Sequence, residues 1–113
     1  MKGPFYMKIP SKLYHGTSLT YVESIYEKGL IAQNNATYVY LTSNIETAYV
    51  YAHKFRQPVI CVIDAEQMIK DGFVFEEKDN EYLITTVPTK YMLLIAVENV
   101  DELHDIEQLK IIL

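Results

Sequence analysis

The chain is poor in the residues on which several classes of function depend. It has one cysteine, Cys61, so no disulfide can form within it. Its three histidines, at positions 15, 53 and 104, have no metal-ligand spacing with each other or with the cysteine, so no metal is expected. Arg56 is the single arginine, and the net charge is −5. That balance argues against a broad basic surface for a long phosphate backbone.

Long apolar runs are also missing. None reaches the length of a membrane span, and the opening MKGPFYMKIP has no apolar core of signal-peptide length. We therefore expect a soluble cytoplasmic protein with no membrane partner. Half of the 113 residues are hydrophobic, which argues against disorder, and the length allows one domain. The expected single domain, 1–113, has an irregular lead-in (1–11), a core (12–97) and a tail (98–113) that is helix or strand.

Two capping signatures predict two helices early in the chain. Thr20 and Glu23 have the spacing of a capping box, and Ser43 and Glu46 repeat it. The two helices are expected to end at Gly29 and at about residue 56. One or two further helical turns are expected over residues 64–70, followed by a turn at 71–72.

Short apolar and aromatic runs predict the strands. They are expected over residues 12–15, 38–41, 58–63, 73–75, 82–86 and 91–97. The charged segment EEKDNE, 76–81, is expected to be a hairpin or a short loop. Short strands with two early helices indicate an α+β domain rather than a parallel βαβ array.

The run Leu-Tyr-His-Gly-Thr, residues 13–17, is the first candidate site. A strand would deliver His15 to its end, and Gly16 would allow a ligand to approach the main chain closely. The alternative is a solvated or structural histidine beside a turn glycine.

Tyr40 and Tyr51 are the second candidate. A strand end, a capped turn and two helical turns separate them, which can bring the two rings face to face across a gap. Such a gap suits a flat cationic heterocycle, through stacking and cation–π attraction. The alternative is that both rings belong to the core.

Glu81 is the third candidate, because it begins a strand of apolar and β-branched residues. A carboxylate at that position would lie at a sheet edge beside a cleft. The alternative is a solvated hairpin charge, like its neighbours in EEKDNE.

Taken together, His15, Tyr40, Tyr51 and Glu81 are similar in order and spacing to the H-Y-E class of ADP-ribosyltransferases. This class includes diphtheria toxin, the poly(ADP-ribose) polymerases and DNA-modifying bacterial toxins. The resemblance covers about residues 12–97. It implies a split β-sandwich of two antiparallel sheets, with NAD as co-substrate in the cleft between them.

A second resemblance is to the catalytic lobe of the tRNA 2′-phosphotransferases, which share that fold and also use NAD. It rests on LYHGT, on the stretch from RQPVI to IDAEQMIKDGFVF, and on VP near residue 88. The preceding nucleic-acid-binding lobe of that family is expected to be absent. Tyr40 stands where that family has a histidine, and Glu81 where no carboxylate is expected. The chain resembles a phosphotransferase-type scaffold that carries an H-Y-E site.

The resemblance to the transferases implies a role for each residue. His15 would hydrogen-bond a ribose hydroxyl, the main chain of Gly16 would hold the nicotinamide amide, and Thr17 belongs to the same NAD-binding segment. Tyr40 and Tyr51 would sandwich the nicotinamide ring.

Glu81 would bind the 2′-hydroxyl of the nicotinamide ribose and place negative charge beside the cation that develops there. Arg56 would bind a phosphate of NAD or of the acceptor, or would only interact with the end of the second helix. Asp79 is expected to be a solvated charge.

The leading prediction is mono-ADP-ribosyl transfer from NAD to a macromolecular acceptor, nucleic acid or protein. A bacterial or phage toxin or effector, with an inhibitor or antitoxin partner, would fit it. One alternative is an RNA 2′-phosphotransferase-like reaction that uses NAD. Another is a non-catalytic module that binds NAD or ADP-ribose, although such a module has no reason to retain Glu81.

Overall fold

The computed structural model describes residues 9–32, 36–54 and 56–109. These residues form a mixed α+β fold in which every strand pairing is antiparallel, as expected. The strands form three sheets rather than the expected two. No helix in the described ranges is long and apolar enough to cross a membrane.

The largest sheet has the order β1-β4-β8, where β1 is Lys12–Ser18, β4 is Pro58–Asp64 and β8 is Met92–Ala96. The middle strand, β4, is buried at five consecutive positions, which explains its unbroken apolar run. Cys61 lies in this run and is fully buried, and burial raises the pKa of its thiol to about 12. This cysteine is a packing residue of the core.

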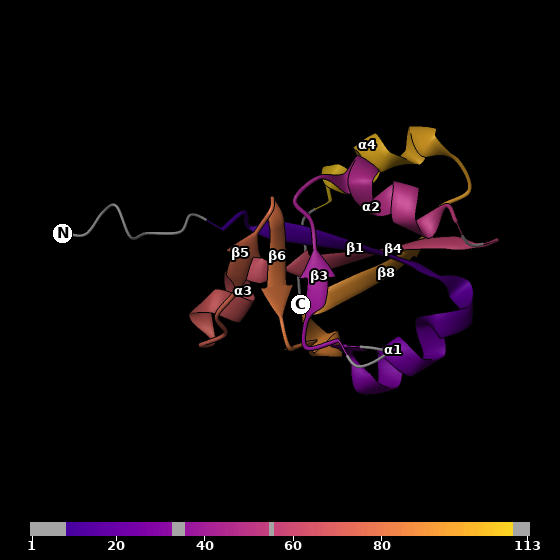
Figure 1. Ribbon diagram of the computed structural model, residues 1–113. Coiled ribbons are helices and arrows are strands. Elements are labelled where there is room, and N and C mark those ends of the chain that lie inside the picture. Colours follow the sequence, from indigo (N-terminus) through magenta and orange to yellow (C-terminus); the bar gives the residue numbers. More distant parts are fainter. Residues whose placement is uncertain (1–8, 33–35, 55, 110–113) are drawn as a thin grey trace.

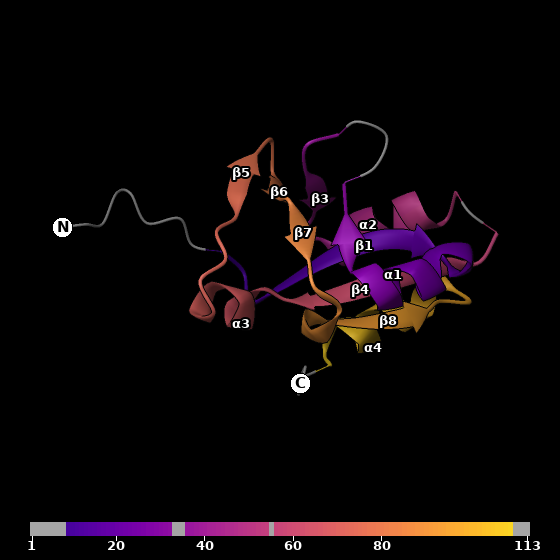
Figure 2. The same cartoon turned by 90° about the horizontal axis from the view of Figure 1, so that it is seen from below.

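The two smaller sheets lie beside one face of this central sheet (Figures 1 and 2). One has the order β3-β6-β5, formed by Val39–Leu41, Glu81–Ile84 and Glu76–Lys78. The other pairs β2 with β7, Leu30–Ile31 with Thr86–Val87.

Helices cover both faces of the central sheet. The four α-helices are α1 (Val22–Lys28), α2 (Ile45–Ala52), α3 (Ala65–Lys70) and α4 (Leu103–Glu107). Single 3-10 turns occupy Leu19–Tyr21, Thr89–Tyr91 and Val100–Glu102. Figure 1 shows α2 and α4 together on one face, with α1 on the other.

The core is divided in two by the central sheet. Leu13 of β1 packs in the cluster shared with the smaller sheets, α1 and α3, whereas Tyr14 packs in the cluster under α2 and α4. Successive residues of a strand point to opposite faces. His15 therefore shares the face of Leu13, toward the smaller sheets, and Gly16 shares the face of Tyr14, toward α2.

Both predicted capping boxes are wrong. Ser18 caps the 3-10 turn by accepting a hydrogen bond from the amide of Thr20 (3.3 Å), and α1 begins after it without a side-chain cap. Asn44, not Ser43, caps α2. The shift has a physical reason: the main chain of Thr42 is still paired with β1, so the turn into the helix comes one residue later.

The second helix is also shorter than predicted, since α2 ends at Ala52 rather than near residue 56. The chain must leave the helix before Pro58 begins β4, and the residue before a proline avoids the helical region. The helix predicted over 64–70 is confirmed as α3, and the following turn at 71–72 is present.

The predicted strand over 73–75 is wrong, because these residues are not part of a ladder; Phe75 is buried in the first core. The charged segment itself forms the hairpin, β5 and β6 joined by Asp79 and Asn80. Both residues have positive φ (53° and 67°), as a two-residue type I′ turn requires. Asp and Asn tolerate this conformation better than most residues, so charge here does not prevent pairing.

The remaining predicted strands are confirmed with changed ends. β1 runs three residues beyond 15, and the run over 82–86 is divided by Thr85 into β6 and β7. In the tail, 103–107 form the helical alternative as α4. Residues 110–113 and most of the lead-in, 1–8, lie outside the described residues.

Candidate functional site

The site lies where the central sheet and the β3 sheet touch and then separate. The amide of Tyr14 donates to the carbonyl of Thr42 (2.7 Å), and the amide of Thr42 donates to the carbonyl of Tyr14 (3.0 Å). In the described residues this is the one main-chain bridge between β1 and the segment of β3 and Thr42. His15 and Gly16 follow the bridge along β1, so they border the gap that opens between the two strands.

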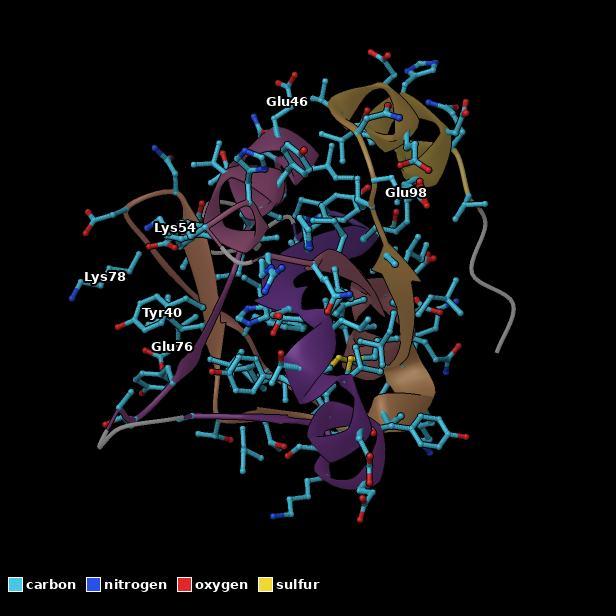
Figure 3. The ribbon with its side chains drawn as sticks, turned by 90° about the vertical axis from the view of Figure 1, so that its right-hand side faces the viewer. Tyr40, Glu46, Lys54, Glu76, Lys78 and Glu98 are labelled. Carbon is cyan, nitrogen blue, oxygen red and sulfur yellow. The ribbon has the colours of Figure 1, made fainter. Side chains whose placement is uncertain are left out.

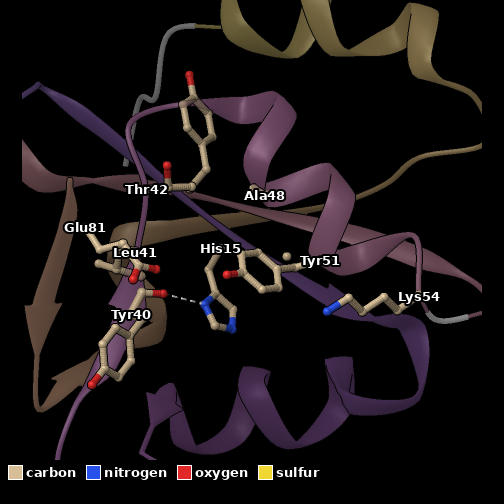
Figure 4. Close-up of a pocket in the computed structure, with 10 residues that line it drawn as sticks. His15, Tyr40, Leu41, Thr42, Ala48, Tyr51, Lys54 and Glu81 are labelled. Carbon is tan, nitrogen blue, oxygen red and sulfur yellow. Dashed lines mark hydrogen bonds between the residues drawn. The ribbon is translucent and has the colours of Figure 1, made fainter. Parts of the chain in front are cut away.

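A cavity of about 520 Å³ fills this gap (Figure 4). Five of the seven predicted site residues line it: His15, Gly16, Tyr40, Tyr51 and Glu81. The other lining residues are Tyr14, Leu41, Thr42, Ala48 and Lys54. The wall is mostly apolar with a few polar groups, which is typical of a small-molecule site.

His15 is held by the main chain of β3. Its Nδ1 lies 3.0 Å from the carbonyl oxygen of Tyr40 (dashed line in Figure 4). Burial lowers the pKa of the imidazole from its ordinary value of 6.5, and the hydrogen bond to Tyr40 opposes this to a smaller extent. The ring is therefore neutral at pH 7. Since a carbonyl only accepts, the proton lies on Nδ1 and Nε2 remains a hydrogen-bond acceptor.

The missing side chain of Gly16 makes room for a helix. The sequence had suggested that it makes room for a ligand. A Cβ on Gly16 would overlap the carbonyl oxygen of Ala48 and lie 2.8 Å from the amide nitrogen of Ala52. Its small size therefore lets α2 pack directly on β1.

The main chain of Gly16 faces the gap. The N–H and C=O of Tyr14 point toward β3, and in an antiparallel strand alternate residues direct these groups to the same side. The N–H and C=O of Gly16 accordingly point into the space where β3 has separated from β1.

The two tyrosines border the same cavity from different elements. Tyr40 belongs to β3 and Tyr51 to the last turn of α2, and both are about half exposed. In Figure 4 the Tyr51 ring lies beside His15, whereas the Tyr40 ring extends away from it. The face-to-face sandwich of the two rings stays a prediction.

Glu81 lines the cavity from the hairpin of β5 and β6. It is the first residue of β6 and pairs with Lys78 across the Asp79–Asn80 turn. Glu81 is partly buried and lines the cavity, unlike the exposed Glu76 and Glu77 of the same hairpin.

Two predicted residues do not line the cavity. Thr17 is buried on the His15 face of β1, farther along the strand. Arg56 is exposed in the bend before β4 and, because α2 ends at Ala52, it is not in the last turn of the helix either. Their predicted roles in binding remain untested.

Lys54 lines the cavity instead, and sequence reasoning missed it. The only signal was its position three residues after Tyr51, which the overlong predicted helix concealed. Within the described parts of the chain, no group of three His, Cys, Asp or Glu could hold a metal ion.

The chain is similar to enzymes that act on RNA. Residues 4–87 match the model of the family described as RNA 2′-phosphotransferase, Tpt1/KptA family. A probable RNA 2′-phosphotransferase of Pseudomonas syringae pathovar tomato is 36% identical over 88 residues, which are 77% of this chain and 46% of that protein. A protein of the same description from Acetivibrio thermocellus is 36% identical over 85 residues, 74% of this chain and 46% of its own length.

The chain thus spans about half the length of the curated relatives that it matches. NAD is the co-substrate of the family. The match includes His15, Tyr40 and Glu81, and it confirms the second of the two resemblances, whereas an H-Y-E type of site stays a prediction. By its match over residues 4–87, three quarters of its length, this chain belongs to the RNA 2′-phosphotransferase, Tpt1/KptA family.

Proposed function

We propose that this chain binds NAD in the cavity between β1 and β3, cleaves its nicotinamide–ribose bond, and directs the ADP-ribosyl group to a phosphate of RNA. The observation that carries this proposal is that His15, Gly16, Tyr51 and Glu81 line one cavity within the segment that matches the family. Its size and mostly apolar wall fit the nicotinamide-ribose end of a dinucleotide.

His15 would bind the ribose as a neutral ring. Its Nδ1–H is occupied by the carbonyl of Tyr40, so Nε2 can accept a hydrogen bond from a ribose hydroxyl. A protonated His15 would offer a second donor in place of that acceptor. The lowered pKa of the imidazole thus favours the binding form at neutral pH.

Gly16 and Tyr51 would hold the nicotinamide. An amide substituent needs one donor and one acceptor, and the N–H and C=O of Gly16 supply both in the gap beside β1. The ring of Tyr51 supplies a flat, electron-rich face for the cationic pyridinium of NAD.

Glu81 would stabilise the charge that appears during the reaction. The bond between the pyridinium nitrogen and ribose C1 breaks, and its electron pair leaves with neutral nicotinamide. Positive charge then develops on the ribose, as in glycoside hydrolysis, until an oxygen of the acceptor phosphate forms the new bond to C1. A carboxylate already positioned beside that carbon lowers the barrier by several kcal/mol, an order of magnitude typical of electrostatic preorganisation.

Mono-ADP-ribosyl transfer to another macromolecule is the second candidate. It is favoured by the polar hollow that adjoins the cavity, shares Tyr51 and Glu81 with it, and includes Asn80. The described residues of that hollow include no Lys or Arg, so it suits a neutral hydroxyl or amide better than a phosphate. The comparisons favour the RNA reaction, and they give no support to a toxin role or an antitoxin partner.

The test is incubation of the chain with NAD labelled in its ADP-ribose part and with four separate acceptors. These are RNA carrying one internal 2′-phosphate, the same RNA with a 2′-hydroxyl, single-stranded DNA and a protein pool. Nicotinamide release and transfer of label are measured. We expect nicotinamide release and label transfer with the 2′-phosphorylated RNA alone, with the label either on that RNA or on the phosphate that leaves it. Label on protein or DNA would favour the second candidate, and binding of NAD without release of nicotinamide would favour a non-catalytic binding module.

A further inference from the structure

Lys54 and Glu81 lie at opposite ends of the cavity (Figure 4). We propose that Lys54 binds the pyrophosphate of NAD and so determines which way the dinucleotide lies: pyrophosphate at the end of α2, nicotinamide ribose at His15 and Glu81. This proposal rests on the proposed function, because it takes NAD as the ligand of the cavity.

The charges of the lining residues match the charges of NAD in one orientation. Among the described residues that line the cavity, Lys54 is the one cation and Glu81 the one carboxylate, because burial keeps His15 neutral. The ligand carries two negative phosphates at one position and develops positive charge at another. A cation at one end and an anion at the other match that distribution in one direction only. Reversed binding would place the phosphates beside the carboxylate of Glu81, where like charges repel. The chain has a net charge of −5, so cations that could offset this repulsion are few.

The position of Lys54 is well suited to an anion. α2 ends at Ala52, and the turn after it places the Nζ of Lys54 5.0 Å from the centre of the Tyr51 ring. The ring holds the ammonium group over the cavity wall without satisfying its N–H donors, and no carboxylate in the described ranges pairs with it. In Figure 3, Lys54 and Tyr40 extend to the same side of the molecule, away from Glu46 at the start of α2.

Arg56 was predicted from the sequence to bind a phosphate of NAD or of the acceptor, or only to interact with the helix end. For the pyrophosphate of NAD, Lys54 is better placed, because it lines the cavity. Arg56 lies two residues farther from the helix, exposed and outside the cavity lining. It is therefore a matched control: a second cation of the same loop that should not contact the ligand.

A purely structural role for Lys54 is the competing explanation. A cation near a helix C-terminus and over a tyrosine ring stabilises the fold whether or not a ligand binds. The two roles differ in which ligands depend on Lys54. A structural lysine would affect the binding of all ligands alike, whereas a lysine that binds the pyrophosphate would affect only ligands that contain the phosphates.

The experiment compares two ligands by NMR titration. ADP-ribose contains the pyrophosphate without nicotinamide, and nicotinamide riboside contains the pyridinium ribose without phosphate. We expect Lys54→Gln to weaken ADP-ribose binding about tenfold, the size typical of one charge-assisted hydrogen bond, and to leave nicotinamide riboside binding within about twofold. Lys54→Arg should restore most of the ADP-ribose affinity, and Arg56→Gln should leave both affinities unchanged. Added salt should weaken ADP-ribose binding less in Lys54→Gln than in the wild type.

Equal ADP-ribose affinity in the wild type and Lys54→Gln would overturn the proposal, as would an equal loss for both ligands. Weakened binding of 2′-phosphorylated RNA with unchanged ADP-ribose binding would overturn it too, and would assign Lys54 to the acceptor. Failure of the proposed function looks different: the wild-type chain would then bind neither NAD nor ADP-ribose, or would bind NAD without releasing nicotinamide.

Discussion

The imidazole of His15 takes the hydrogen-bond acceptor that the main chain of Gly16 would use if β3 stayed paired with β1. Tyr14 and Thr42 exchange both main-chain hydrogen bonds, so the next such pair along a continuous ladder would be Gly16 and Tyr40. Instead, His15 Nδ1 lies 3.0 Å from the carbonyl oxygen of Tyr40. The His15 side chain thus ends the ladder, because it occupies the carbonyl oxygen of Tyr40. The amide of Gly16 is left facing the cavity.

Nicotinamide release should depend on the neutral form of His15. Burial lowers the pKa of this imidazole below 6.5, so the rate should stay constant as pH falls from 8 to about 6.5 and decline only below that. The pKa itself can be measured from the pH dependence of the His15 ring signals by NMR, with a His15→Gln variant for assignment. A ring that titrates above 6.5 would contradict the prediction.

The same group links stability to pH. Its folded-state pKa lies below the unfolded value of about 6.5, so the unfolded chain binds the proton more readily. Its contribution to the free energy of unfolding is complete above about pH 6.5 and is lost as pH falls through the lowered folded-state pKa. The His15→Gln variant should lose less stability than the wild type over this interval, as followed by urea unfolding at several pH values.

Gly16→Ala should destabilise the fold by about 2–3 kcal/mol, because its methyl group would overlap the main chain of α2. Gly72→Ala is the control: nothing lies within 4 Å of a Cβ there, and only its φ of +100° opposes the change. That strain should cost about 1 kcal/mol. Both values follow from urea unfolding, and equal stability of the two variants would show that α2 can move away from β1 at little cost.

Tyr51→Leu should weaken NAD binding more than ADP-ribose binding. ADP-ribose loses only the ring that positions Lys54, whereas NAD also loses the stacking surface for its nicotinamide. Stacking on one aromatic ring is typically worth about 1–3 kcal/mol. Tyr40→Leu should have the same selective effect if the two rings sandwich the nicotinamide. A loss in Tyr51→Leu alone would mean that the Tyr40 ring, which extends away from His15, contacts another part of the substrate.

Glu81→Gln should slow catalysis with little effect on binding, because the positive charge that the Glu81 carboxylate stabilises arises only in the transition state. We expect NAD affinity within about threefold of the wild type, or about 0.7 kcal/mol. Nicotinamide release should fall at least about a hundredfold, or about 2.7 kcal/mol. Glu77→Gln removes an exposed charge from the same hairpin, outside this cavity, and should leave the rate unchanged. Normal turnover by Glu81→Gln would show that Glu81 is only a surface charge. The RNA reaction would then proceed without a carboxylate at this position.

Local patterns determined most of the elements, and they pointed to five residues that line one cavity. The apolar run of β4, the helix over 64–70 and the Asp-Asn turn follow from side-chain preferences that act over a few residues. The order of His15, Tyr40 and Glu81 along the chain was likewise enough to suggest an NAD site. These inferences needed no knowledge of packing.

Only the tertiary structure decided where strands separate and what fills the gap. Thr42 pairs with Tyr14, which is far from it in the sequence, and this contact places the helix cap at Asn44 rather than at Ser43. The early end of α2 placed Lys54 in the cavity lining and left Arg56 outside it. Long-range pairing overrides local preference because each such hydrogen bond satisfies main-chain groups that no neighbouring residue can reach.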